Sequence, residues 1–217
     1  MKYYRIPDET IKRLPLYVRH LQVLAKDGRA SIRSAEFTES LGVRSAQVRK
    51  DLAYFGSFGK PGVGYDIRKL LEQLRQILKL KHVNRTAIVG VGDLGSALIS
   101  YPGFSRFSFE IVAAFDNDHE KVGQTRDNIL VEDISELKTL KKRGIKLAIM
   151  AVPARAAQRV ADDLVKAGVV GILNFAPCYL TVPKKIKLIS VDIAMYLAYL
   201  PYYLPGSMKS KNRNEVL

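Results

Sequence analysis

Three glycines at fixed spacing carry the clearest chemistry in this sequence. Gly90, Gly92 and Gly95 follow an apolar run and precede a segment of helical pattern. In such a motif the first glycine permits a tight turn, the second lets the backbone approach a pyrophosphate, and the third lets the helix pack closely on the strand. The helix N-terminus adds free N–H groups and a positive dipole. Residues Gly90-Val91-Gly92-Asp93-Leu94-Gly95 are therefore predicted to bind the phosphates of a dinucleotide.

An acidic residue stands where such a site requires one. Asp116 ends the next predicted strand, 21 residues after Gly95. Its carboxylate can accept hydrogen bonds from the adenosine ribose and would repel a 2′-phosphate. Asn117 follows it, where an NADP site would favour arginine. The prediction is an NAD(H) site, and a Rossmann-like fold with an empty site is the alternative.

Two later strand ends are candidates for the rest of that site. Val152-Pro153 and Asn174-Phe175 each end a predicted strand. Ligands of open parallel sheets bind beyond the carboxyl ends of the strands. The alternative is that proline simply terminates each strand.

The sequence offers no catalytic residue. None of His20, His82 and His119 lies at a strand end on the nicotinamide side, and Cys178 lacks an activating neighbour. No His/Cys cluster has metal-ligand spacing. These features predict nucleotide binding without turnover and without a metal. The rival hypothesis is an NAD-dependent dehydrogenase with a helical accessory domain.

The elements that hold these residues change character near residues 82–85. Before that point apolar residues recur at helical spacing, and after it β-rich runs alternate with helical ones, as in parallel βαβ units. We therefore predict an N-terminal winged helix-turn-helix domain over 1–82 and an α/β Rossmann-like parallel sheet domain over 83–190. The predicted strands are 86–91, 109–115, 146–152, 169–175 and 187–191.

The pattern of the N-terminal third predicts a helical hairpin. A first helix ends at Gly28, with Pro15 expected to kink it or split off a short helix. Ser34 is predicted to cap a helix over 35–41, and Ser45 to cap a third over 46–55, with a tight turn between them.

The third helix has the side chains of a DNA-reading helix. Gln47 can pair with adenine, Arg49 with guanine or a phosphate, and Lys50 with a phosphate. A plain structural hairpin is the alternative. The glycine-rich stretch 56–65 then predicts two short strands with Lys60 at their turn, which is the pattern of a basic wing. Its alternative is a structural turn with Lys60 merely solvated.

Charge supports a polyanionic partner. The formal net charge is +14, and residues 1–81 hold 17 Lys and Arg against 8 Asp and Glu. No apolar run approaches the roughly 18–20 residues that span a bilayer. A single cysteine excludes an intramolecular disulfide and fits a reducing compartment. We expect a cytoplasmic protein that does not enter a membrane.

Residues 191–205 form an apolar segment with helical pattern, followed by a polar tail at 206–217. A helix that is apolar almost all round must be buried on several sides. It can pack on its own sheet or insert into a partner subunit as a swapped element.

Four segments together resemble the Rex family of redox-sensing transcriptional repressors. Ser45–Gly56 resembles the recognition helix of that family and Gly59–Tyr65 its wing, and Tyr101–Phe104 and Gly171–Pro177 resemble two further family stretches. The resemblance extends from about residue 6 to 204.

This resemblance implies a homodimer on a palindromic double-stranded operator, released when NADH binds and retained with NAD⁺. It also implies a C-terminal helix swapped between subunits. By this resemblance the DNA-contacting residues are Ser45, Gln47, Arg49, Lys50, Tyr54 and Lys60. Arg19, Tyr101 and Asp192 match positions that relay redox state, and Tyr101 and Asp192 join the predicted nucleotide site.

Overall fold

The computed structural model describes residues 6–60 and 62–204, without the side chain of Lys60. The chain divides into two compact units, residues 1–83 and 84–217. We call them the N-terminal unit and the C-terminal unit and describe each by itself. The predicted polar tail at 206–217 lies outside the described residues.

The described residues of the N-terminal unit form four helices and a small antiparallel sheet of order β1-β3-β2. This is the arrangement of a winged helix, in which a helix-turn-helix is followed by a β-hairpin. The helices are α1 Asp8–Lys26, α2 Ser34–Leu41, α3 Ser45–Ala53 and α4 Ile67–Ile77, and the strands are β1 Ser31–Ile32, β2 Gly59–Lys60 and β3 Gly64–Asp66.

The first helix is continuous through Pro15, so the predicted separate short helix is wrong. An internal proline costs about 3 kcal/mol of helix stability. Leu14, Tyr17, Val18 and Leu21 are fully buried on α1, which packs on α4. Burial of each such side chain contributes roughly 1.5–3 kcal/mol, so the packing outweighs the lost hydrogen bond.

The two serines predicted as helix caps lie inside the helices instead. Arg33 and Arg44 occupy the N-cap positions of α2 and α3. At α2 the carboxylate of Glu36 accepts the N–H of the N-cap residue Arg33 at 2.7 Å. Gly42 ends α2 in the left-handed conformation, with φ of 66°, and this gives the tight turn before α3.

The wing has one strand more than the sequence indicated. β2 and β3 form the predicted hairpin, and β1 pairs with the other edge of β3. Gly64 has φ of 99°, and a Cβ there would collide with the carbonyl oxygen of Ile32 at 2.5 Å. β1 was missed because two residues are too few to show strand periodicity.

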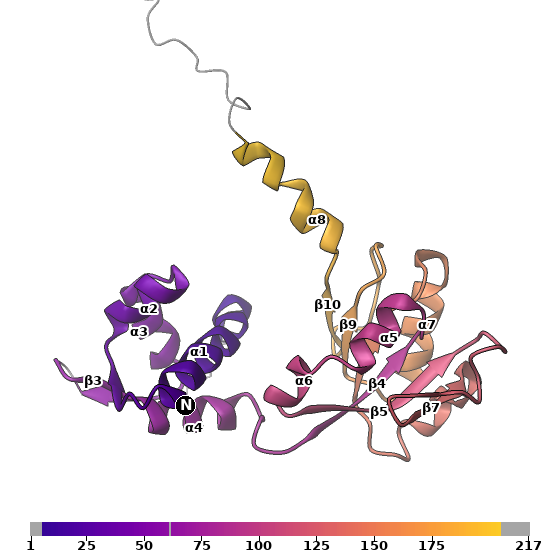
Figure 1. Ribbon diagram of the computed structural model, residues 1–217, viewed down its shortest axis with the longest axis horizontal. Coiled ribbons are helices and arrows are strands. Elements are labelled where there is room, and N and C mark those ends of the chain that lie inside the picture. The colour runs from indigo at the N-terminus through magenta and orange to yellow at the C-terminus, as the bar shows by residue number, and fades with distance from the viewer. Residues whose placement is uncertain (1–5, 61, 205–217) are drawn as a thin grey trace, which may run out of the picture. The chain divides into compact units, whose positions relative to one another are not determined.

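The C-terminal unit contains a seven-stranded sheet of order β10-β9-β8-β4-β5-β7-β6, parallel except for the edge strand β6 (Figure 1). The order places β4, which carries the glycine motif, at the centre. The strands are β4 Asn84–Val89, β5 Phe109–Asp116, β6 Thr125–Arg126, β7 Ile129–Asp133, β8 Leu147–Met150, β9 Gly171–Asn174 and β10 Lys187–Ser190. The pair β6 and β7 was not predicted.

Helices cover the two faces of this sheet unequally. On one face Ala87 and Val89 pack with α7 (Ala154–Lys166) and the 3₁₀ helix η1 (Ile134–Thr139). On the other face Ile88 packs with α5 (Asp93–Ile99) and with Phe104 in α6 (Gly103–Arg106). β8, β9 and β10 therefore present an open apolar surface on the α5 face.

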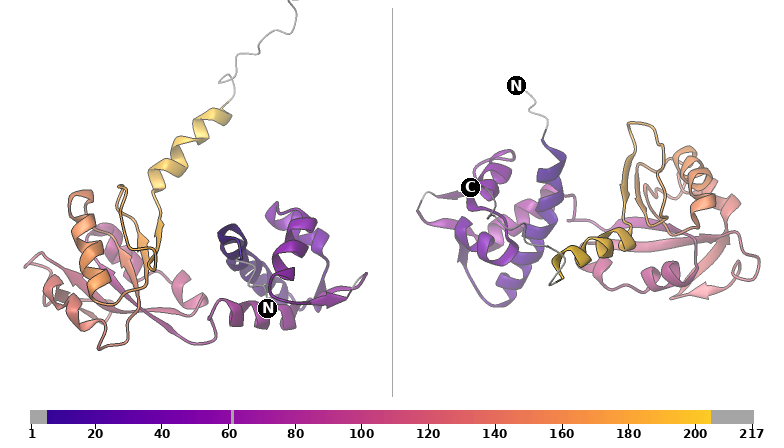
Figure 2. Two further views of the ribbon diagram at one scale, coloured as in Figure 1. Left: turned by 180° about the vertical axis from the view of Figure 1, so that it is seen from behind. Right: turned by 90° about the horizontal axis from the view of Figure 1, so that it is seen from above.

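The last two helices of the described chain expose their large apolar side chains. α8 (Ile193–Ala198) and η2 (Leu200–Tyr203) stand clear of the sheet of their own unit (Figures 1 and 2). Their large apolar side chains are all exposed, from 49% at Leu200 to 72% at Tyr203. Of the two alternatives left open by the sequence, packing on the chain's own sheet does not occur in this structure.

Candidate DNA-binding and nucleotide-binding sites

The glycine-rich turn after β4 has the geometry expected of a phosphate-binding loop. Gly90 has φ of 91°, and a Cβ there would press on the carbonyl group of Ala151. A Cβ on Gly95 would collide with the carbonyl oxygen of Gly90, so α5 approaches β4 through this glycine. Gly92 is exposed, and a Cβ there would meet no atom within 4 Å. The turn is thus closely packed at its first and third glycines and open at its second.

Asp116 stabilises this turn by a hydrogen bond to its backbone. Its carboxylate is almost buried, and its Oδ2 accepts the Val91 N–H at 2.7 Å. Its Oδ1 accepts the Asp118 N–H at 3.0 Å. The acidic residue predicted for the ribose therefore also fixes the backbone of the phosphate-binding turn.

Lys121 is a cation of this site that the sequence did not indicate. Its Nζ lies 3.6 Å from Asp116 Oδ2 and 3.1 Å from Asp118 Oδ2. The hydrogen bond with Asp118 raises the pKa of Lys121. A lysine in the loop after β5 matches no spacing rule, so only the folded loop reveals its partners.

The later strand ends are engaged within the protein. Asn174 is fully buried; its amide donates to the Ala176 carbonyl and the Ser190 hydroxyl, both at 3.1 Å, and accepts the Ala176 N–H. This ties the end of β9 to β10. Phe175 packs against the core on the α5 face. Val152 is half-buried, and Pro153 is the N-cap of α7.

The three predicted relay residues lie on different elements. Arg19 is exposed on α1 in the N-terminal unit. Tyr101 follows α5 in the C-terminal unit, is 55% exposed, and packs edge-on against Phe104 with ring centroids 5.2 Å apart. Asp192 caps α8 by accepting the N–H groups of Ala194 and Met195.

The side chains of the third helix fall into two groups. Arg49 and Lys50 are exposed, and Arg49 donates to the Ser34 hydroxyl at 3.0 Å. Ser45 and Tyr54 are half-buried at the two ends of α3. Gln47 points the other way, and its Nε2 donates to Asp51 Oδ1 at 2.8 Å.

A groove of about 540 Å³ lies between the helix-turn-helix and the wing. Arg33 and Arg49 line it together with the glycines of the hairpin. The side chain of Lys60, at the end of β2, is not described. Glycines beside two arginines leave room for the sugar-phosphate backbone of a nucleic acid.

Asp51 is a buried charged residue that the sequence analysis did not single out. It is 0% exposed on α3, and Thr10, Arg13 and Tyr17 of α1 all donate to its carboxylate. Burial alone would raise the pKa of Asp51, but the hydrogen bonds from Arg13, Tyr17, Gln47 and Thr10 outweigh it. They lower the pKa from an ordinary 3.8 to about 2.

This pKa predicts a defined loss of stability in acid. Because the folded state lowers the pKa of Asp51, its contribution is complete above about pH 4 and disappears as the pH falls toward 2. The contribution amounts to about 2 kcal/mol. Burial also lowers the pKa of His20, which destabilises the fold as the pH falls below its ordinary 6.5.

The measurement is denaturant unfolding of the full chain at a series of pH values, followed by circular dichroism. Asp51→Asn should make the decline between pH 4 and 2 shallower and leave the decline below pH 6.5 in place. Glu36, Asp118 and Asp133, whose pKa values are also lowered, keep their share of the acid decline. An unchanged profile in this variant would contradict the assignment to Asp51.

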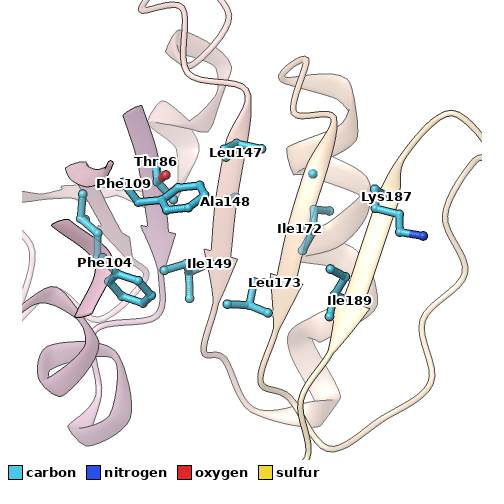
Figure 3. Close-up of a pocket in the computed structure, with 12 residues that line it drawn as sticks. Thr86, Phe104, Phe109, Leu147, Ala148, Ile149, Ile172, Leu173, Lys187 and Ile189 are labelled. Carbon is cyan, nitrogen blue, oxygen red and sulfur yellow. The ribbon is translucent and has the colours of Figure 1, made fainter. Parts of the chain in front are cut away.

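A second, apolar groove lies on the open sheet face of the C-terminal unit. It measures about 350 Å³ and is formed by side chains of β4, β5, β8, β9 and β10 with Phe104 of α6 (Figure 3). Phe104, Ile149, Leu173 and Ile189 lie along it, and Lys187 at its edge is the charged member. Such a surface on a folded unit is typical of a protein interface.

Two kinds of site are not found in the part of the chain that the structure describes. No group of three or more His, Cys, Asp or Glu residues could hold a metal ion there. None of the helices in that part is long and apolar enough to cross a bilayer.

Comparison with known proteins assigns both units. Residues 5–53 match a family model described as "Putative DNA-binding protein N-terminus", and residues 82–178 match the model "CoA binding domain". A Rex repressor of Chloroflexus aurantiacus is 46% identical over 199 residues, 91% of this chain and 94% of its own length. One of Carboxydothermus hydrogenoformans is 46% identical over 203 residues, 93% and 98% of the two chains.

Solved structures give the same assignment. RSP, a Rex-family repressor, in complex with NAD⁺ and operator DNA has a TM-score of 0.86 and 34% identity, with 91% of this chain and 92% of that chain covered. RSP in complex with NADH has a TM-score of 0.82 and 33% identity, with 91% and 93% covered.

A DNA-binding helical unit joined to a Rossmann-like unit defines a nucleotide-dependent regulator of transcription rather than an enzyme. The chain belongs to the Rex family of redox-sensing transcriptional repressors.

Proposed function

We propose that this chain binds a palindromic operator as a homodimer and is released from it when NADH binds. The observation that carries the proposal is the combination, in one chain, of exposed Arg49 and Lys50 on α3 with the open space at Gly92. RSP, solved with operator DNA and NAD⁺ and separately with NADH, supports it. Acting on operator DNA would place the protein in the cytoplasm.

DNA binding is assigned to α3 and the wing. Arg49 and Lys50 contact base edges or phosphates, and Ser45 and Tyr54 contact the backbone at the two ends of the helix. Lys60 in the wing meets the adjacent backbone or minor groove. Gln47, the predicted base reader, donates one amide N–H to Asp51, which leaves its carbonyl oxygen and second N–H to meet a base edge.

The nucleotide is assigned to the carboxyl edge of the sheet. The pyrophosphate lies over Gly92, and Val91, Asp93 and Leu94 surround it together with the closely packed Gly90 and Gly95. Asp116 accepts the adenosine ribose hydroxyls and disfavours a 2′-phosphate, so the ligand is NAD(H). The nicotinamide half would lie toward Val152, Pro153, Asn174, Phe175, Tyr101 and Asp192.

Two exposed apolar surfaces of the chain support a homodimer. Residues 193–204 expose large apolar side chains that a solitary chain would leave in water. The apolar groove between α6 and β10 is likewise uncovered. A swapped dimer would bury both surfaces. This burial would stabilise the dimer, since removing apolar surface from water contributes about 25 cal/mol per Å².

A charged pair on the swapped helix is expected to break the dimer. Met195 and Leu197 are 66% and 65% exposed, so Met195→Glu with Leu197→Glu leaves each folded unit intact. Buried glutamates at the interface would cost several kcal/mol, which corresponds to a loss of affinity between subunits of roughly 100-fold or more. Light scattering should show a monomer.

The control is Lys185→Glu, which makes the same change of net charge at an exposed loop position. It should remain dimeric. A dimer in the double variant would show that residues 193–204 do not form the interface.

Redox sensing requires that NADH and NAD⁺ differ in their preference between DNA-bound and released conformations. Equal preference shifts no equilibrium, however tight the binding. Arg19, Tyr101 and Asp192 are assigned to relay that difference. The positive charge of the oxidised nicotinamide, near the Asp192 carboxylate, is a source for it.

The deciding experiment titrates each nucleotide against a fixed complex of protein and operator. The operator is a duplex selected by the full-length protein from random-sequence DNA, and the salt concentration is held constant. NADH should release the duplex and NAD⁺ should not. Equal behaviour of the two nucleotides would overturn the proposal.

A further inference from the structure

Arg33 is an exposed cation of the N-terminal unit that the proposed DNA contacts do not include. It is the N-cap residue of α2. The nearest acidic residue along the chain, Glu36, forms its ion pair with Arg29. Within residues 6–60 and 62–204, no side chain forms an ion pair with the Arg33 guanidinium. The charge of Arg33 is therefore free to meet an anionic ligand.

The side chain of Arg33 lies on the groove between the helix-turn-helix and the wing. A Cβ on Gly64 of β3 would lie 3.2 Å from Arg33 Cγ, so the methylene chain of Arg33 passes close over the wing at this glycine. On β2, a Cβ on Gly59 would lie 2.6 Å from the Gly64 carbonyl oxygen and 2.8 Å from Tyr65 Cδ1. Both glycines line the groove, so backbone rather than side chains borders it there.

Arg49 reaches the same groove from α3. Its Nη1 donates to the Ser34 hydroxyl at 3.0 Å, and Ser34 lines the groove beside Arg33 at the start of α2. The bond uses one N–H of the Arg49 guanidinium and leaves the others for a ligand. Among the described residues that line the groove, none is an aspartate or a glutamate. Two arginines without a carboxylate make this groove a site for an anion.

The elements on either side of the groove identify the anion. In a helix-turn-helix the second helix enters the major groove of DNA and the first helix crosses the sugar-phosphate backbone. A wing meets the adjacent minor groove or backbone. The backbone that separates the two grooves of the duplex must then pass between α3 and the wing. Arginine binds a phosphate there through charge-assisted N–H···O bonds.

We propose that Arg33 and Arg49 together hold one phosphate of the operator backbone in this groove. Arg33 is then a DNA-binding residue outside α3 and the wing, and Arg49 contacts a phosphate rather than guanine. The inference rests on the proposed DNA binding through α3 and the wing. A contact of this kind fixes the register of the protein on the duplex and does not select sequence.

The test uses the duplex that full-length wild type selects from random-sequence DNA. One phosphate at a time is replaced by a neutral methylphosphonate, and affinity is measured for each duplex at fixed salt. Replacing the phosphate held in the groove should weaken wild type by roughly 10-fold, as expected for hydrogen bonds to a charged group.

Arg33→Ala and Arg49→Ala should each bind the unmodified duplex roughly 10-fold less tightly. In each variant the loss caused by methylphosphonate at that one position should fall to about 3-fold or less, because the phosphate has already lost a partner. At every other position the two variants should respond as wild type does. Both should also select the wild-type consensus.

Two controls keep the result interpretable. Arg68→Ala removes the same residue type from an exposed position on α4, and it should keep the wild-type response at every phosphate. Arg33→Ala retains the backbone N–H that bonds to Glu36, so the start of α2 should stay folded. Circular dichroism and NADH binding check the fold of each full-length variant.

Three outcomes would overturn the inference. The first is wild-type affinity and response in Arg33→Ala. The second is an effect of Arg33→Ala and Arg49→Ala at two different phosphates, because the two side chains would then not share a ligand. The third is a relaxed consensus in Arg49→Ala, which would show that Arg49 reads a base. If wild type selects no duplex at all, the proposed DNA binding itself fails, and the inference fails with it.

Discussion

Replacing Arg49 and Lys50 together by alanine is expected to abolish operator binding while leaving NADH affinity unchanged. Both side chains are exposed on α3, and neither is buried in the core of the N-terminal unit. Loss of a base contact and a phosphate contact costs roughly 1–3 kcal/mol each, which amounts to about 100-fold or more. Fluorescence anisotropy with a labelled operator duplex measures the loss.

The salt dependence separates the roles of the two cations. Each lost phosphate contact lowers the slope of log affinity against log salt by about one. Arg68→Ala with Lys69→Ala is a matched control, because it removes the same two residue types from exposed positions on α4. An equal loss in this control pair would mean that net charge, and not α3, carries the binding.

Gly92→Val is expected to abolish NADH binding and make operator binding insensitive to NADH. The backbone of Gly92 has φ of −80°, which any residue adopts, and a Cβ there would meet no protein atom within 4 Å. A side chain at this position therefore enters the space assigned to the pyrophosphate. We expect a loss of roughly 100-fold or more in NADH affinity, or about 2.7 kcal/mol, measured by calorimetry.

Gly95→Val is the contrasting variant. Its Cβ would collide with the carbonyl oxygen of Gly90, so it should destabilise the fold of the C-terminal unit as well as the site. Gly92→Val should keep the wild-type thermal unfolding temperature. NADH release of the operator that persists in a folded Gly92→Val protein would contradict the placement of the pyrophosphate.

The sequence predicts most clearly what depends on neighbours along the chain. The glycine motif and the turn at Gly42 are both local patterns. Membership in the Rex family, predicted from four segments, is confirmed by relatives that are 46% identical over more than nine-tenths of the chain.

What the sequence could not predict depends on distant pairs. The donors of α1 lie 34 to 41 positions from Asp51, and no periodicity links them to it. An aspartate in an amphipathic helix is ordinarily a surface residue, so its complete burial could not be read from the pattern. The bond from Gln47 to Asp51, by contrast, joins two residues four positions apart on one helix, and this local pair was not predicted.

The hydrogen bonds that Asn174 makes within the protein could not be predicted from the sequence either. Its amide closes the turn after β9 and reaches Ser190 on β10, 16 positions away. A strand-end asparagine is a typical ligand-binding position, but a buried amide must first satisfy its own hydrogen bonds. In the structure the Asn174 amide links the ends of β9 and β10 by a hydrogen bond. Its contact with the nucleotide stays a prediction.

The central claim is that the operator and NADH oppose each other through one protein. The most direct measurement is the affinity for NADH with and without saturating operator, beside the affinity for operator with and without saturating NADH. Linkage requires the two ratios to be equal. We expect each ligand to weaken binding of the other by the same factor, well above one. Independent binding, with both ratios equal to one, would contradict it.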